Sequence, residues 1–137
     1  MGAGVATVGR RKYAVGLYWQ PSPSGRVAAA AKEAAVQPGQ QSEFFAVRSG
    51  VKGGRVAQFG LGQAQSGHKR GQATLAATLA NRQPGSWAGA FKLLEGIVVI
   101  VVRDDLIAPD GDQIYIDEAA ARDRLVQEVT LGGLQRI

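Results

Sequence analysis

The chain has 137 residues, a length typical of one domain that buries its own core without metals or disulfides. It contains no Cys and one His, which excludes a disulfide framework and cysteine or multi-histidine metal sites and favours a cytoplasmic setting. Its formal net charge of +5 is uneven, because residues 1–92 carry a net +10 and residues 93–137 a net −5. Either the two parts interleave and neutralise each other, or they present faces of opposite sign to charged partners.

The sequence predicts three pairs of strands, each pair followed by a helix. Each predicted strand is a short run rich in β-branched, aromatic or other apolar residues, bounded by Gly, Pro or polar turn residues. The strands are predicted at residues 5–8, 13–19, 44–48, 55–61, 87–94 and 96–103. The predicted helices are Ala-rich and contain neither Gly nor Pro, which favours helix over strand. They are predicted at residues 26–36, 72–81 and 118–129.

This order favours an α/β or α+β domain built from repeated β-β-α units. We expect one domain over residues 1–137, with a mixed, largely antiparallel sheet covered by helices. The run of Ile and Val at residues 97–102 predicts a strand buried on both faces. It is far shorter than the roughly 20 apolar residues that span a bilayer. No secretory signal is visible in the first twenty residues.

The densest acidic cluster follows the buried strand. Its members are Asp104, Asp105, Asp110, Asp112, Asp117 and Glu118. Oxygen ligands can hold Ca²⁺ or Mg²⁺, but the spacing does not match an EF-hand loop, so we expect no metal here. Residues 109–111, Pro-Asp-Gly, are typical of a turn, and Asp117 is typical of a helix cap. We expect a short alternating strand between this turn and the cap. We interpret the cluster as turn, cap and partner-docking residues.

Two basic clusters lie in predicted loops. They are Arg10, Arg11 and Lys12, and His68, Lys69 and Arg70. The second cluster precedes a helix in a Gly-rich loop, a position suited to anions and phosphates. With the aromatic residues these clusters could form a nucleic-acid surface, although most of the aromatics lie in apolar strands, where core packing is favoured. A nucleic-acid-binding module is therefore the alternative function.

The motifs of common enzyme classes are absent from the sequence. It has no P-loop, no G-x-S-x-G elbow and no H-E-x-x-H pair, and His68 is its only histidine. We expect no catalytic residue and no cofactor.

Six short motifs, each weakly specific by itself, follow one another along nearly the whole chain in a characteristic order. They are YAVGLYWQP at 13–21, QFGLG at 58–62, LAA at 75–77, WAGAF at 87–91, LIAPDGD at 106–112 and DEAAAR at 117–122. In this order and spacing they resemble the N-terminal domain of the PilO family of pilin accessory proteins from type IVb pilus systems.

The resemblance implies a cytoplasmic domain of an inner-membrane protein in the pilus assembly platform, anchored by a membrane helix that lies outside this chain. It implies a role similar to that of the cytoplasmic part of the type II secretion L protein, with an actin-like or ribonuclease H-like fold. Such domains dock the assembly ATPase and neighbouring platform proteins without catalysis. We therefore expect a docking domain at the cytoplasmic face of the bacterial inner membrane, and a homodimer and residual nucleotide binding stay open.

Overall fold

The computed structural model describes residues 2–22, 26–37, 42–51 and 56–137. Within them the chain forms eight strands, three α-helices and one 3-10 turn. The elements are β1 (Gly4–Val8), β2 (Arg11–Val15), β3 (Tyr18–Pro21), α1 (Val27–Ala35), β4 (Phe44–Val51), β5 (Val56–Gly62), η1 (Ala64–Ser66), α2 (Leu75–Arg82), β6 (Trp87–Leu93), β7 (Gly96–Arg103), β8 (Leu106–Tyr115) and α3 (Glu118–Leu131).

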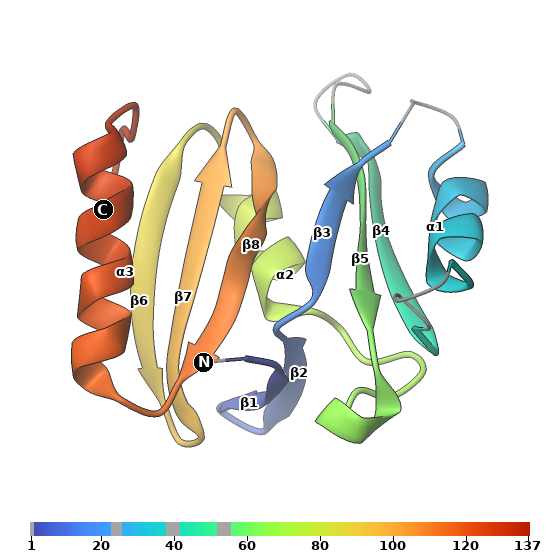
Figure 1. Cartoon of the computed structure of the whole chain (residues 1–137), viewed down its shortest axis with the longest axis horizontal. Helices are drawn as coiled ribbons and strands as arrows, with labels where there is room; N and C mark the ends of the chain where they lie inside the picture. The colour runs from blue at the N-terminus through green and yellow to red at the C-terminus, as the bar shows by residue number, and fades with distance from the viewer. Residues whose placement is uncertain (1, 23–25, 38–41, 52–55) are drawn as a thin grey trace.

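The strands of the described residues form three antiparallel sheets, in the orders β1-β2, β3-β5-β4 and β6-β7-β8. The two larger sheets stand side by side, with β3 next to β8 and α2 between them, and α1 and α3 lie at the two outer ends (Figure 1). The predicted α+β class with largely antiparallel strands is confirmed. The actin-like or ribonuclease H-like topology stays a prediction.

The segment predicted as one strand at residues 13–19 forms two strands, because the extended conformation is interrupted at Gly16. The φ of Gly16 is +84°, and a Cβ at this position would overlap the backbone of Ala3. β2 therefore ends before the break and pairs with β1, whereas β3 begins after it and pairs with β5. One continuous strand could not reach both partners.

The prediction of a turn at residues 109–111 is wrong. These residues lie inside β8, at a bulge opposite Ile100–Val102. The chain reverses instead at Asp104 and Asp105, whose φ angles are 51° and 69°. Two central residues of positive φ form a hairpin turn whose twist matches the flanking strands, and Asp tolerates this conformation. The first unit therefore contains three strands where two were predicted. In the third unit, the short strand predicted after the turn is the end of a longer strand, β8.

β7 is the centre of the core, as the run of β-branched residues predicts. Val98, Ile100 and Val102 face a cluster that includes Trp19 and the buried face of α2. Val99 and Val101 face the opposite way, toward α3. Because both faces of β7 are covered, the strand has no polar face, which explains its continuous apolar sequence.

Candidate interaction surfaces

The six acidic residues of the predicted docking surface do not come together in the fold. Asp104 and Asp105 form the tip of the β7–β8 hairpin, whereas Asp117 and Glu118 begin α3 beyond the other end of β8. The ten residues of β8 separate the two groups by roughly 30 Å along the strand. Asp112, between them, is 0% exposed. Its assignment to an exposed surface is therefore wrong.

Asp112 instead joins β8 to the break between β2 and β3. Its Oδ1 accepts a hydrogen bond from the backbone N–H of Gly16 at 2.9 Å. Its Oδ2 accepts from Leu17 N at 3.2 Å and from the indole Nε1 of Trp19 at 2.9 Å. Burial raises the pKa of the Asp112 carboxyl, and these three donors oppose the rise. The residue is a buried cross-link between distant parts of the chain.

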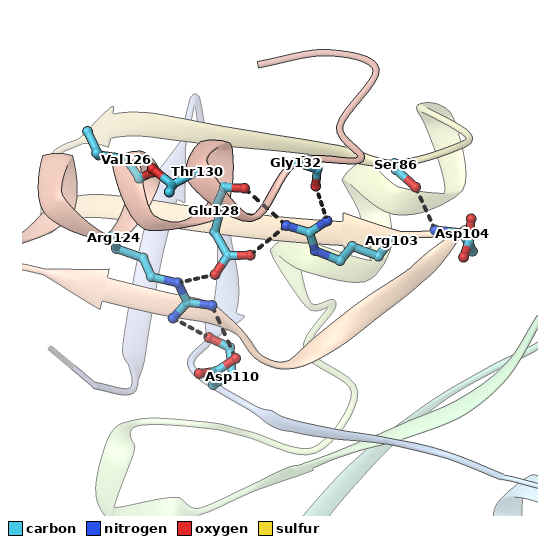
Figure 2. Close-up of polar contacts among 9 residues, drawn as sticks. All are labelled: Ser86, Arg103, Asp104, Asp110, Arg124, Val126, Glu128, Thr130 and Gly132. Carbon is cyan, nitrogen blue, oxygen red and sulfur yellow. Dashed lines mark hydrogen bonds and ion pairs between the residues drawn. The ribbon is translucent and has the colours of Figure 1, made fainter.

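The hairpin tip presents its acids in a defined position. Asp105 Oδ1 accepts a hydrogen bond from Gly85 N at 2.6 Å. Figure 2 shows the second bond, in which Asp104 N donates to the hydroxyl of Ser86 at 2.9 Å. Beside the tip lies a cavity of about 650 Å³. It is lined by Val56, Gly85, Ser86, Asp104, Asp105, Gly133 and Gln135. Asp104 remains exposed at its rim.

A buried arginine lies behind the same tip. The side chain of Arg48 donates to the backbone carbonyl of Asp105 and to Asn81 Oδ1, both at 3.0 Å, and it also contacts Gln58. Burial lowers the pKa of Arg48, while the charge of Asp105 raises it. The tip is thus supported from the core side.

A chain of charged side chains holds α3 against its sheet (Figure 2). Glu128, only 9% exposed, accepts from Arg103 of β7 and from Arg124 one helical turn before it, each at 3.1 Å. Arg103 also donates to the carbonyl of Gly132 at 2.7 Å, just beyond the end of α3. Arg124 reaches Asp110 of β8 at 3.1 Å. Asp110 is therefore already paired within the molecule.

Sequence reasoning missed this network, although its helical half carries a local signal. Arg124 and Glu128 are four residues apart on a predicted helix, the spacing at which side chains on one face meet. The contact with Arg103 has no such signal, since it depends on how α3 docks. At the other end of α3, the predicted cap is confirmed, because Asp117 Oδ1 accepts from Ala119 N at 3.0 Å.

His68 is buried, whereas the prediction placed it on an exposed basic surface. It is 5% exposed, and its Nδ1 accepts a hydrogen bond from Gln63 N at 3.1 Å. Nε2 must then carry the ring proton, and it lies 2.9 Å from the Val15 carbonyl and 3.1 Å from the Gly4 carbonyl. The histidine connects the loop before α2 to the open end of the β1–β2 hairpin.

The other five residues of the predicted basic surface lie in two separate patches. Arg10, Arg11 and Lys12 are exposed at the closed end of the β1–β2 hairpin. Lys69 and Arg70 line a cavity of about 410 Å³ together with Lys32 of α1. His68, next to Lys69, contacts the open end of the β1–β2 hairpin. The two patches are therefore separated by the length of the hairpin's five-residue strands, about 17 Å. These positions do not favour one continuous track for a nucleic acid, and the nucleic-acid alternative stays a prediction.

Two further properties concern the described residues only. They contain no group of three or more His, Asp or Glu side chains placed to hold a metal ion. None of their helices combines the length and the apolar character that crossing a membrane requires.

Comparison with known families decides the membership of the chain. Residues 13–132 match the model of the pilin accessory protein (PilO) family. The chain belongs to this family. The crystal structure of the cytoplasmic domain of BfpC has a similar fold, with a TM-score of 0.71 and 28% sequence identity over 94% of this chain and 76% of that one. The curated proteins include no significant match. The predicted family is confirmed, and the protein is a pilin accessory protein.

Proposed function

We propose that this pilin accessory protein is a cytoplasmic domain of the type IVb pilus assembly platform at the inner membrane. In this role it docks the assembly ATPase and neighbouring platform proteins and catalyses no reaction itself. The observation that carries the proposal is the similarity over 94% of the chain to the cytoplasmic domain of BfpC, together with the family match.

The tip of the β7–β8 hairpin is the acidic surface best suited to docking. Asp104 is exposed beside the 650 Å³ cavity, and the bonds from Ser86 and Gly85 hold the turn in place. A charge at the rim of a cavity steers a basic partner, and because the backbone of the turn is already held, the turn itself need not be ordered on binding. The start of α3 is the second acidic surface, but there Asp117 caps the helix and Glu118 pairs with Arg122.

Binding of the purified ATPase to the whole chain, measured by interferometry, tests both the function and the surface. Asp104→Asn removes the charge while tolerating the positive φ, and we expect it to weaken binding roughly fivefold and to reduce the salt dependence. Glu118→Gln is the matched control for the α3 surface and should bind as the unchanged chain does.

Three outcomes would count against parts of this proposal. Loss of binding in Glu118→Gln alone would move the docking surface to α3. Equal binding by both variants and the unchanged chain would reject both acidic surfaces. An ATPase that does not bind the unchanged chain at all would reject the docking function.

A further inference from the structure

β6 is an outer strand of its sheet, and part of its outer edge has no hydrogen-bonded partner among the described residues. Its inner edge pairs with β7 over its whole length. On the outer edge, Ala88 N donates to the carbonyl of Arg136 at 3.2 Å, so this N–H points away from β7. Backbone groups alternate along a strand, so those of Ala90 and Lys92 point outward too. Both residues are exposed, and no hydrogen bond from the described residues reaches these outward groups.

A groove of about 440 Å³ runs beside this open edge. Trp87 and Phe91 of β6 and Leu79 of α2 form its apolar part, and all three belong to or pack against the main core cluster. The indole N–H of Trp87 already donates to the Gln83 carbonyl at 2.8 Å, so the ring offers mainly apolar surface. The groove can therefore accept apolar side chains from a strand laid along β6.

The charged side chains that line the groove are both cationic. Arg82 and Arg136 line it, and the exposed Lys92 follows on the same edge. No Asp or Glu occurs among its described lining residues. Side chains alternate between the two faces of a strand, and Lys92 lies on the face of Ala88, opposite Trp87 and Phe91. A strand that turns apolar residues into the groove would therefore place the residues between them beside Lys92, which favours acidic residues there and repels basic ones.

We propose that the outer edge of β6 binds an extended, acidic segment of a partner protein, which adds a fourth strand to the β6-β7-β8 sheet. Its backbone bonds to Ala90 and Lys92, while alternate apolar side chains enter the groove. A second copy of this chain is the poorer occupant, because pairing β6 with β6 brings the same cations together; an outward Lys is a common protection against such pairing. This inference is independent of the ATPase contact proposed above.

Two variants and one control separate the contributions of backbone and charge. Ala90→Pro removes an outward N–H but no bond to β7, which is the arrangement in which an edge strand tolerates proline. Lys92→Glu reverses one exposed charge on the edge. Lys69→Glu makes the same change on the exposed loop before α2, away from the groove.

The probes are fluorescein-labelled peptides that alternate Glu with Val, the Lys-Val counterpart, and the Glu-Val peptide with methylated backbone nitrogens. In fluorescence anisotropy, we expect the Glu-Val peptide to bind at least about tenfold more tightly than the other two. Ala90→Pro and Lys92→Glu should each weaken its binding by about the same factor, and Lys69→Glu should not. Amide exchange of Ala90 and Lys92 in the unchanged chain should slow when the peptide is present.

Several results would overturn the inference. They are equal affinity for the Glu-Val and Lys-Val peptides, a loss of Glu-Val affinity in Lys69→Glu as large as in Lys92→Glu, and amide exchange at Ala90 and Lys92 that does not change when the peptide is added. A dimer in sedimentation that Lys92→Glu strengthens would identify a second copy as the occupant instead. If Ala90→Pro fails to fold, Lys92→Glu and the exchange measurement still decide.

Discussion

Replacing Asp112 by Asn should destabilise the protein far more than a surface substitution of the same kind. The Asn side chain keeps one oxygen, which can accept from Gly16 N. Its NH₂ group replaces the oxygen to which Leu17 N and Trp19 Nε1 donate. Two buried donors then face another donor, and each unsatisfied donor costs about 1–3 kcal/mol. Removing the buried charge offsets part of this cost, so we expect a loss of about 2–3 kcal/mol in the free energy of unfolding.

Urea unfolding followed by tryptophan fluorescence measures this loss, because Trp19 and Trp87 are both buried. Asp110→Asn is the matched control, two residues away on the same strand. The Asp110 side chain is 72% exposed and its ion pair with Arg124 is solvent-accessible, so this change should cost less than about 1 kcal/mol. The reasoning is refuted if Asp112→Asn costs no more than Asp110→Asn.

Two further predictions follow from the same contacts. Because burial raises the pKa of Asp112 in the folded state, its contribution to stability should be complete below the unfolded pKa of about 3.9 and decline as the pH rises through the folded pKa. Unfolding measured across that range should therefore show a downward slope in the unchanged chain relative to Asp112→Asn, and equal slopes would contradict the assignment. Glu128→Ala leaves Arg103 and Arg124 without their shared carboxylate and should cost about 1–3 kcal/mol, with faster amide exchange in the last turn of α3. Glu118→Ala breaks only an exposed pair and should cost less than about 1 kcal/mol, so a similar cost for both would show that the network does not hold α3.

The elements with strong local signals were predictable from the sequence. β7 follows from an uninterrupted run of β-branched residues, and the start of α3 follows from Asp117 before an Ala-rich stretch. The family was also predictable, because its soft motifs keep their order along most of the chain. Each of these features is carried by neighbouring residues, so it needs no knowledge of what packs against it.

The break at Gly16 and the true β7–β8 turn lay beyond such signals. Pro-Asp-Gly is a good turn sequence in isolation, but β8 pairs with β7 through it, and the bulge absorbs the irregularity. The reversal at Asp104 and Asp105 is supported by Gly85 and Ser86, roughly twenty residues earlier in the chain. Strand pairing over such distances overrides local turn preference.

The sequence by itself determined the α+β class, the buried strand, the helix cap and the membership of the pilin accessory family. Only the tertiary structure decided which polar residues are available to a partner. Asp112 and His68 resemble surface residues in the sequence, yet both are buried. Asp112 bonds to Gly16 and Trp19, and His68 to the Val15 carbonyl, all more than fifty residues away along the chain. The open edge of β6 likewise exists only once its sheet has formed. Burial and strand pairing depend on contacts between residues that are far apart in the sequence, and local sequence patterns do not specify those contacts.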